Sequence, residues 1–275
     1  MFERGNRGKA GRPVFVRAQF TPQDVRLQSF FQDFLTNGVI SLETSPKRDN
    51  HKGRGIFKGA FAVPDFTHER NIPDLFAPRN GLIAGVDEAG RGPLAGPVVA
   101  GAVIFPNFEI DGYLKNELND SKKLTAAKRE KLFDALHASN ALIGFGMASV
   151  EEIDALNILQ ATFLAMRRAV EALPRKPDFA LIDGNKIPPS LPCPAQALVK
   201  GDALSLSVAA ASIVAKVTRD RIMTDLAKEF PFYGWEKNAG YGTKAHLDGI
   251  AAHGVCPHHR KTFAPIKDMV GQPLP

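Results

Sequence analysis

Four carboxylates stand at or just past the ends of short apolar runs. They are Asp87 and Glu88 after LIAGV, Asp183 after FALI, and Asp202 after ALVKG. Reactive groups in α/β proteins collect where strands end. Carboxylates gathered at one place repel one another, so they must share a proton, pair with Lys or Arg, or hold cations. The pattern favours a divalent-cation site, because hard oxygen ligands suit Mg²⁺ or Mn²⁺.

Such a site could cleave a phosphodiester, because two bridged metals can activate a water and stabilise the leaving oxygen. Each acid also has a structural interpretation. Asp183 with Gly184 is a common turn dipeptide, and Asp202 could cap the helix that follows. The adjacent pair Asp87 and Glu88 is the hardest to explain without a cation or a basic partner.

The segment GRGPLAG, which follows these acids, suggests a rival function. A glycine-rich turn after a strand can hold a dinucleotide pyrophosphate. The spacing here is Gly90-x-Gly92-x-x-x-Gly96, one residue too long for that motif, and Pro93 and Pro97 interrupt the helix that must follow. The segment is not a P-loop either, since it has no Gly-Lys-Ser/Thr.

Three further segments carry groups suited to a polyanion. Lys122 lies in NDSKKL, before a predicted helix, and Tyr241 lies between two glycines, which tends to expose its ring. The cluster CPHHRKTF at 256–263 contains two adjacent histidines, which point apart and are poorly placed to chelate one metal. We expect Arg260 or Lys261 to contact phosphate rather than to belong to a zinc site.

The hydrophobic pattern predicts the elements that must position these groups. Strands are expected at 82–87, 96–105, 141–149, 178–183 and 195–200, and helices at 125–138, 149–173 (one or two), 204–230 and 243–253. Ser149 and Glu152 stand at the spacing of a capping box. This order predicts an α/β domain with a mixed sheet.

The charge is distributed unevenly. The chain has a net charge of +6, and residues 1–80 hold 13 Lys and Arg against 8 Asp and Glu, whereas the remaining residues hold 22 against 21. Residues 21–38 predict one short amphipathic helix, packed on the protein or on a partner rather than on a membrane. Residues 1–13 predict disorder, and residues 44–80 predict a loosely ordered arm.

The location of the protein is also constrained by the sequence. Cys193 and Cys256 form no CxxC motif, which favours a reducing compartment. There is neither a long apolar run nor a secretory signal. We therefore expect a cytoplasmic protein without membrane contact.

The ordered motifs GVDEAGRGPLAGPVVAGAV, NDSKKL, LIDGNK, VKGD, AASIVAKVTRD and GYGTKAH resemble type 2 ribonuclease H, ribonuclease HII. The resemblance covers residues 81–270 and not the first 80. It implies three parts, namely a basic and largely irregular extension (1–80), a catalytic domain (81–270) and a short tail (271–275). The related ribonuclease HIII has GTG where this chain has Gly90-Arg91-Gly92.

The resemblance implies an RNase H-like fold, with a mixed central sheet flanked by helices, and a monomer that uses Mg²⁺ or Mn²⁺. The implied reaction hydrolyses the RNA strand of RNA–DNA hybrids and nicks duplex DNA 5′ of embedded ribonucleotides, which serves ribonucleotide excision. Two metal ions would assist, and the products would carry 5′-phosphate and 3′-hydroxyl ends. Two other classes stay open at this point, a noncatalytic nucleic-acid-binding protein and a nucleotide-cofactor enzyme.

The site residues carried over from the family form two sets. The metal-binding acids would be Asp87, Glu88, Asp183 and Asp202. The substrate-binding set would be Gly90, Arg91 and Gly92 at the ribose 2′-hydroxyl, Lys122 near the scissile phosphate, and Tyr241 on the next deoxyribose.

Overall fold

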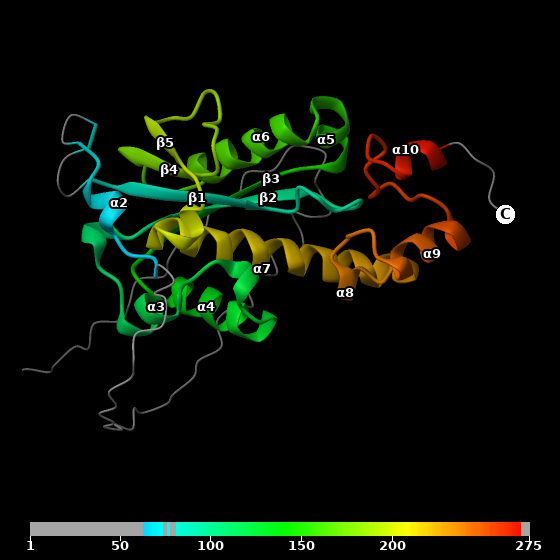
Figure 1. The fold of residues 1–275 in the computed structure, drawn as a ribbon, viewed down its shortest axis with the longest axis horizontal. Coiled ribbons are helices and arrows are strands. Elements are labelled where there is room, and N and C mark those ends of the chain that lie inside the picture. The colour runs from blue at the N-terminus through cyan, green and yellow to red at the C-terminus, as the bar shows by residue number, and fades with distance from the viewer. Residues whose placement is uncertain (1–62, 74–75, 78–80, 271–275) are drawn as a thin grey trace, which may run out of the picture.

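A five-stranded mixed sheet with helices on both faces forms the centre of the protein (Figure 1). The computed structural model describes residues 63–73, 76–77 and 81–270. The strands are β1 (Ile83–Ala89), β2 (Val98–Ile104), β3 (Leu142–Ala148), β4 (Phe179–Asp183) and β5 (Ala195–Leu198). Their spatial order is β3-β2-β1-β4-β5. The predicted mixed sheet and its flanking helices are confirmed.

The strand directions bring two of the acids to one edge of the sheet. β1, β2 and β3 pair antiparallel in sequence, whereas β4 pairs parallel with both β1 and β5. Val86 of β1 lies opposite Ile182 of β4. The next residues, Asp87 near the end of β1 and Asp183 at the end of β4, therefore lie at the same end of neighbouring strands.

Two long helices cover opposite faces of the sheet, and the others pack around them (Figure 1). α7 (Leu206–Glu229) lies against β1 and β2, and α6 (Ile158–Glu171) lies against β3 and β2. The remaining helices are α2 (Thr67–Arg70), α3 (Gly112–Glu117), α4 (Ala126–Ala138), α5 (Val150–Leu156), α8 (Trp235–Asn238), α9 (Lys244–His253) and α10 (Ile266–Met269). In the described part of the chain, none of the helices has both the length and the apolar character needed to cross a membrane.

Local sequence signals fix where the helices begin. Ser149 accepts a hydrogen bond from the Glu152 backbone, and the Glu152 side chain accepts from the Ser149 backbone, so the predicted capping box is confirmed. Ser205 caps α7 by accepting from Val208 N. α7 is buried along most of its length, because the sheet lies on one side and α4 on the other.

Residues 63–77 pack against the domain where they are described, although the sequence placed them in the loosely ordered arm. The Phe66 ring lies edge-on to Phe105, with centroids 5.7 Å apart. Glu69 is buried and accepts from Ser205 Oγ at 2.6 Å and from Ser207 N at 3.0 Å. The segment thus holds the start of α7. The predicted helix at 21–38, the segment 1–13 and the tail 271–275 lie outside the described residues.

Two truncations should therefore differ in stability. Deleting residues 1–77 removes the buried Phe66 ring and the charged hydrogen bonds of Glu69, whereas deleting 1–62 keeps both. Burial of one large apolar side chain and bonds to one carboxylate are together worth roughly 3 kcal/mol. We expect the longer deletion to lower the free energy of unfolding by that amount, which urea denaturation measures as a lower midpoint. Coincident midpoints would show that the segment adds nothing to the fold.

Candidate active site

The four acids singled out in the sequence converge at the carboxyl ends of β1 and β4. Asp87 is 4% exposed and Asp202, in the 3₁₀ turn Gly201–Ala203 after β5, is 6% exposed. Asp183 Oδ1 accepts from Gly201 N at 2.7 Å, which ties the end of β4 to the turn that carries Asp202. Glu88 follows Asp87 in β1, and its backbone N–H donates to Asp87 Oδ1 at 2.7 Å.

The carboxylates influence one another electrostatically. Burial raises the pKa of Asp87 well above its usual range, and the charges of Glu88 and Asp183 raise it further. Burial also raises the pKa of Glu88, although Arg91, 3.2 Å away, opposes the shift. The pKa of Asp202 is raised by burial and then by the charge of Asp183. The four acids thus share one site in which negative charge is poorly compensated.

Lys122 is a second cation beside this group, after Arg91. Its Nζ lies 3.8 Å from Asp202 Oδ2. Partial desolvation favours the neutral amine, but the charges of Asp87 and Asp202 outweigh it and raise the pKa of Lys122. The backbone N–H of Lys122 donates to Asp120 Oδ1 at 2.9 Å. Arg129 of α4 donates to the carbonyl of Leu124 at 2.6 Å, and this bond fixes the segment that carries Lys122.

Asp120 is a fifth carboxylate that the sequence reasoning missed. It caps the 3₁₀ turn Ser121–Lys123, and its charge contributes to the raised pKa of Asp202. The signal was its place in NDSKKL, two residues before Lys122.

The donor chemistry of the site fits a divalent cation. As placed, no three His, Cys, Asp or Glu side chains among the described residues form a set that could hold one metal ion. Four clustered carboxylates nevertheless supply hard oxygen ligands, and a cation would relieve the repulsion that raises their pKa values. Asp87, Glu88, Asp183 and Asp202 are the residues that would hold it.

The segment GRGPLAGP, which we name the ribose loop (residues 90–97), connects β1 directly to the antiparallel β2. No helix follows it, so it lacks the helix N-terminus that a dinucleotide fold needs. Gly90 has φ +96°, and a Cβ there would lie 1.9 Å from Arg219 Nε. Only glycine permits this approach.

Arg260 or Lys261 was expected to contact phosphate. The expectation is wrong for Arg260, whereas Lys261 is exposed and stays a prediction. The Arg260 side chain is completely buried, and its guanidinium donates to four backbone carbonyls of the ribose loop, at Gly90, Arg91, Gly96 and Pro97. It has no path to a phosphate. Arg219, which the sequence reasoning also missed within the Ala-rich helix, is buried beside the same loop.

The ring of Tyr241 is 49% exposed, as predicted for a residue between glycines. A Cβ built at Gly92 would lie 3.6 Å from Tyr241 Cε1. Gly92 and Tyr241 are 149 positions apart in the sequence and become neighbours in the fold.

A buried histidine pair fixes the backbone at Tyr241. His259 Nδ1 accepts from Cys256 N, so its Nε2 carries the proton and donates to His246 Nε2 at 3.0 Å. Trp235 Nε1 donates to the same nitrogen of His246. His246 must therefore carry its proton on Nδ1, which donates to the Tyr241 carbonyl at 3.0 Å. Burial lowers the pKa of His259 to about 4 and so keeps the pair neutral.

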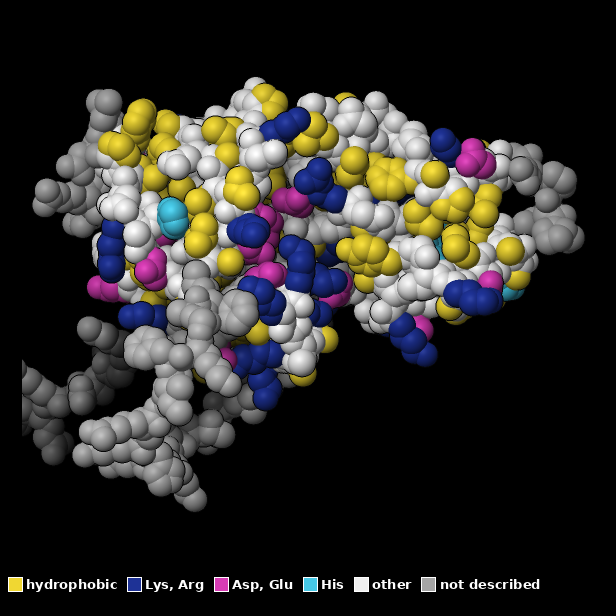
Figure 2. All heavy atoms as spheres, viewed as in Figure 1, with side chains coloured by type: hydrophobic (Ala, Val, Ile, Leu, Met, Phe, Trp, Pro, Cys, Tyr) yellow, Lys and Arg dark blue, Asp and Glu magenta, His cyan; other side chains and the backbone are white. Residues whose placement is uncertain are grey.

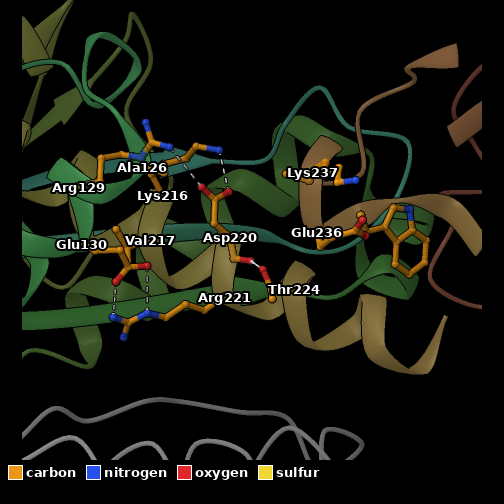
Figure 3. A pocket seen from close by; sticks show the side chains of 12 residues that line it. Ala126, Arg129, Glu130, Lys216, Val217, Asp220, Arg221, Thr224, Glu236 and Lys237 are labelled. Atoms are coloured by element: carbon orange, nitrogen blue, oxygen red, sulfur yellow. Dashed lines mark hydrogen bonds and ion pairs between the residues drawn. The ribbon is translucent and has the colours of Figure 1, made fainter. Parts of the chain in front are cut away.

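A polar cavity of about 320 Å³ lies between α4, α7 and α8 (Figure 3). The charges that α4 and α7 contribute are paired, since Lys216 lies 2.7 Å from Asp220, Arg129 lies 3.7 Å from Asp220 and Arg221 pairs with Glu130. Figure 2 shows Lys and Arg side chains around Asp and Glu side chains in the middle of the face drawn. A cavity of this kind is unlike the mainly apolar pockets that hold organic cofactors.

The mixed sheet and the carboxylates at its strand ends are those of a metal-dependent nuclease with an RNase H-like fold. The family model described as ribonuclease HII matches residues 84–266. The chain belongs to the ribonuclease HII family.

Individual relatives agree with this assignment. Ribonuclease HII of Ruegeria pomeroyi is 60% identical over 190 residues, covering 69% of this chain and 79% of that protein. Ribonuclease HII of Paramagnetospirillum magneticum is 58% identical over 204 residues, covering 74% and 97%. The crystal structure of ribonuclease H2 from Pyrococcus horikoshii OT3 matches with a TM-score of 0.57 at 29% identity, covering 68% and 96%.

Family membership defines the basic activity. The chain is a divalent-metal-dependent ribonuclease H, and it cleaves RNA within RNA–DNA hybrids endonucleolytically. Its substrate is therefore a nucleic acid.

Proposed function

We propose that this ribonuclease also nicks duplex DNA on the 5′ side of a single embedded ribonucleotide, leaving 5′-phosphate and 3′-hydroxyl ends. The observation that carries the proposal is the closeness of Gly92 to Tyr241, since a Cβ built at Gly92 would lie 3.6 Å from the Tyr241 ring, in the loop that directly follows the strand of Asp87 and Glu88. The loop that contacts the ribose 2′-hydroxyl then lies next to the Tyr241 ring that packs on a deoxyribose. A ribonucleotide followed by a deoxyribonucleotide is the step that satisfies both.

The catalytic residues in this proposal are Asp87, Glu88, Asp183 and Asp202, which hold two ions of Mg²⁺ or Mn²⁺. When bound, the metals supply an activated water and stabilise the leaving oxygen of the phosphodiester. Lys122, whose ammonium lies beside Asp202, binds the scissile phosphate and offsets its charge.

The ribose loop supplies the substrate specificity. Gly90, Arg91 and Gly92 contact the 2′-hydroxyl through their backbone, which the absence of a Cβ at two of the three positions allows. The 2′-hydroxyl is the group that lets a protein distinguish RNA from DNA at one position. The exposed ring of Tyr241 packs on the following sugar, where a 2′-hydroxyl would obstruct it.

One assay tests the proposal. A DNA duplex with one embedded ribonucleotide is incubated with the protein and Mg²⁺, and parallel samples contain EDTA or an all-deoxy duplex. We expect a single nick 5′ of the ribonucleotide with Mg²⁺ alone. Retarded mobility in a gel without any nick would instead support a protein that binds this duplex and does not cleave it.

The N-terminal segment adds duplex affinity in our proposal. Residues 1–62 hold 11 Lys and Arg against 5 Asp and Glu, so they account for the whole net charge of +6. Basic groups that neutralise phosphates release counterions and make binding salt-dependent.

Deleting residues 1–62 should therefore weaken duplex binding and flatten its salt dependence. With a slope of about −0.9 per phosphate contact and 11 Lys and Arg in the segment, the slope of log K against log salt should become less negative by at most about 10. Fluorescence anisotropy at several salt concentrations measures it. Superimposable plots for the full chain and the truncated chain would exclude a role for the segment in binding.

A further inference from the structure

Two buried arginines donate to backbone carbonyls on both sides of the proposed ribose site. Arg219 is 1% exposed and Arg260 is completely buried. Within the described residues neither forms an ion pair with a carboxylate, and the side-chain hydrogen bonds of both end on carbonyl oxygens. Burying a cation without a carboxylate is costly unless its donors are satisfied, so these bonds are needed structurally.

Among the described residues, the side-chain hydrogen bonds of Arg260 all end on the ribose loop. Its Nη1 donates to Arg91 O at 2.8 Å, its Nε donates to Gly96 O at 3.0 Å, and its Nη2 reaches the carbonyl of Gly90. The two ends of the loop are thereby tied to one rigid planar group.

Arg219 connects the ribose loop to the segment that carries Tyr241, which we name the tyrosine loop (residues 239–243). Its Nε donates to Pro97 O at 3.0 Å and its Nη2 to Ala95 O at 3.1 Å. Its Nη1 donates to Ala239 O, two residues before Tyr241, at 2.9 Å. One guanidinium thus fixes both loops at once.

Backbone contacts show how close the two loops are. Leu94 N donates to Gly240 O at 2.8 Å. A Cβ built at Gly240 would lie 2.6 Å from Ala95 O, so a side chain there would push the loops apart. The spacing between the loops is therefore tightly constrained, and among the described residues Arg219 is a side chain that hydrogen-bonds to both of them.

We propose that Arg219 is a positioning residue that sets the distance between the ribose loop and Tyr241, and thereby the preference for a ribonucleotide followed by a deoxyribonucleotide. The inference rests on the proposed function. A continuous RNA strand offers a ribose to the ribose loop at every step and no deoxyribose to Tyr241. Cleavage at a single ribonucleotide in DNA needs both loops correctly spaced. Its kcat/KM should therefore fall more than that of the hybrid when the spacing changes.

The test compares kcat/KM for two substrates of one length, a DNA duplex with a single ribonucleotide and an RNA–DNA hybrid. The ratio of the two values does not depend on the fraction of folded enzyme. Arg219→Lys keeps the charge but loses the planar fork. The matched control is Arg168→Lys, because Arg168 on the opposite face of the sheet donates to Met147 O and to Glu152 and touches neither loop.

We expect Arg219→Lys to lower the single-ribonucleotide to hybrid ratio about tenfold, since misplacement by about 1 Å can cost 10²-fold in rate. Arg168→Lys should lower the melting temperature and leave the ratio within about twofold of wild type, as expected of a structural arginine. An unchanged ratio in folded Arg219→Lys overturns the inference.

A second variant tests the spacing if Arg219→Lys does not fold. Gly240→Ala separates the loops from the other side and should also lower the ratio, whereas an unchanged ratio overturns the inference. A wild-type enzyme that cleaves the hybrid but not the single ribonucleotide instead overturns the proposed function, so the two failures are distinguishable.

Discussion

Asp87→Asn is expected to lower cleavage of both substrates by about 10³-fold. Asp87 is the most buried of the four acids, and burial together with the charges of Glu88 and Asp183 raises its pKa. Replacing a carboxylate by an amide removes a charged ligand from the proposed metals. Metal stabilisation of a transition state is worth several kcal/mol, which corresponds to about a thousandfold in rate. Single-turnover kinetics measure the loss.

Duplex binding should survive the same substitution, because the amide keeps the size of the side chain and removes a negative charge that repels phosphates. The control is Asp111→Asn at the cap of α3, where Asp111 accepts from Leu114 N at 2.9 Å. Asparagine caps helices as well as aspartate does, so cleavage there should stay at the wild-type rate. Wild-type turnover by Asp87→Asn would remove Asp87 from the metal site.

Gly85→Ala should cost about 3 kcal/mol of folding free energy. Gly85 is in β1 where the strand crosses α7, and a Cβ there would lie 2.1 Å from the backbone carbon of Ser207 and 2.2 Å from Val208 N. Backbone cannot move aside as a flexible side chain can, so the helix must shift off the sheet. A loss of that size is large against a total stability of about 5–15 kcal/mol.

Urea denaturation measures the effect as a lower midpoint with an unchanged slope. The control is Gly112→Ala at the first position of α3, where a Cβ would meet nothing within 4 Å. Alanine is the better helix former there, so the control should be neutral or slightly stabilising. Equal midpoints for Gly85→Ala and wild type would mean that α7 and β1 can separate freely.

Much of this fold was predictable because its signals are short-range. Each strand from β1 to β5 and the helices α4 to α7 and α9 stand where hydrophobic periodicity and turn residues placed them. The helix caps could be read directly, as Ser149 with Glu152 shows. Such signals lie within a few residues of one another, and so a linear sequence contains them in full.

The sequence also determined which groups carry the proposed chemistry. Carboxylates at the ends of apolar runs could be recognised without a structure, and parallel pairing of β1 with β4 then brought Asp87 and Asp183 to one edge. Their number and type predict a cation site. They do not specify how the substrate is held.

The positions around the site were decided by the tertiary structure alone. Arg260 or Lys261 was expected at a phosphate, yet Arg260 is buried on carbonyls of residues as far as 170 positions away. Arg219 meets carbonyls 122 and 124 positions away. The local sequence shows only that a charged arginine is present. Whether the charge faces solvent or holds a buried loop depends on which carbonyls lack partners in the folded chain, and those lie on segments far away in the sequence.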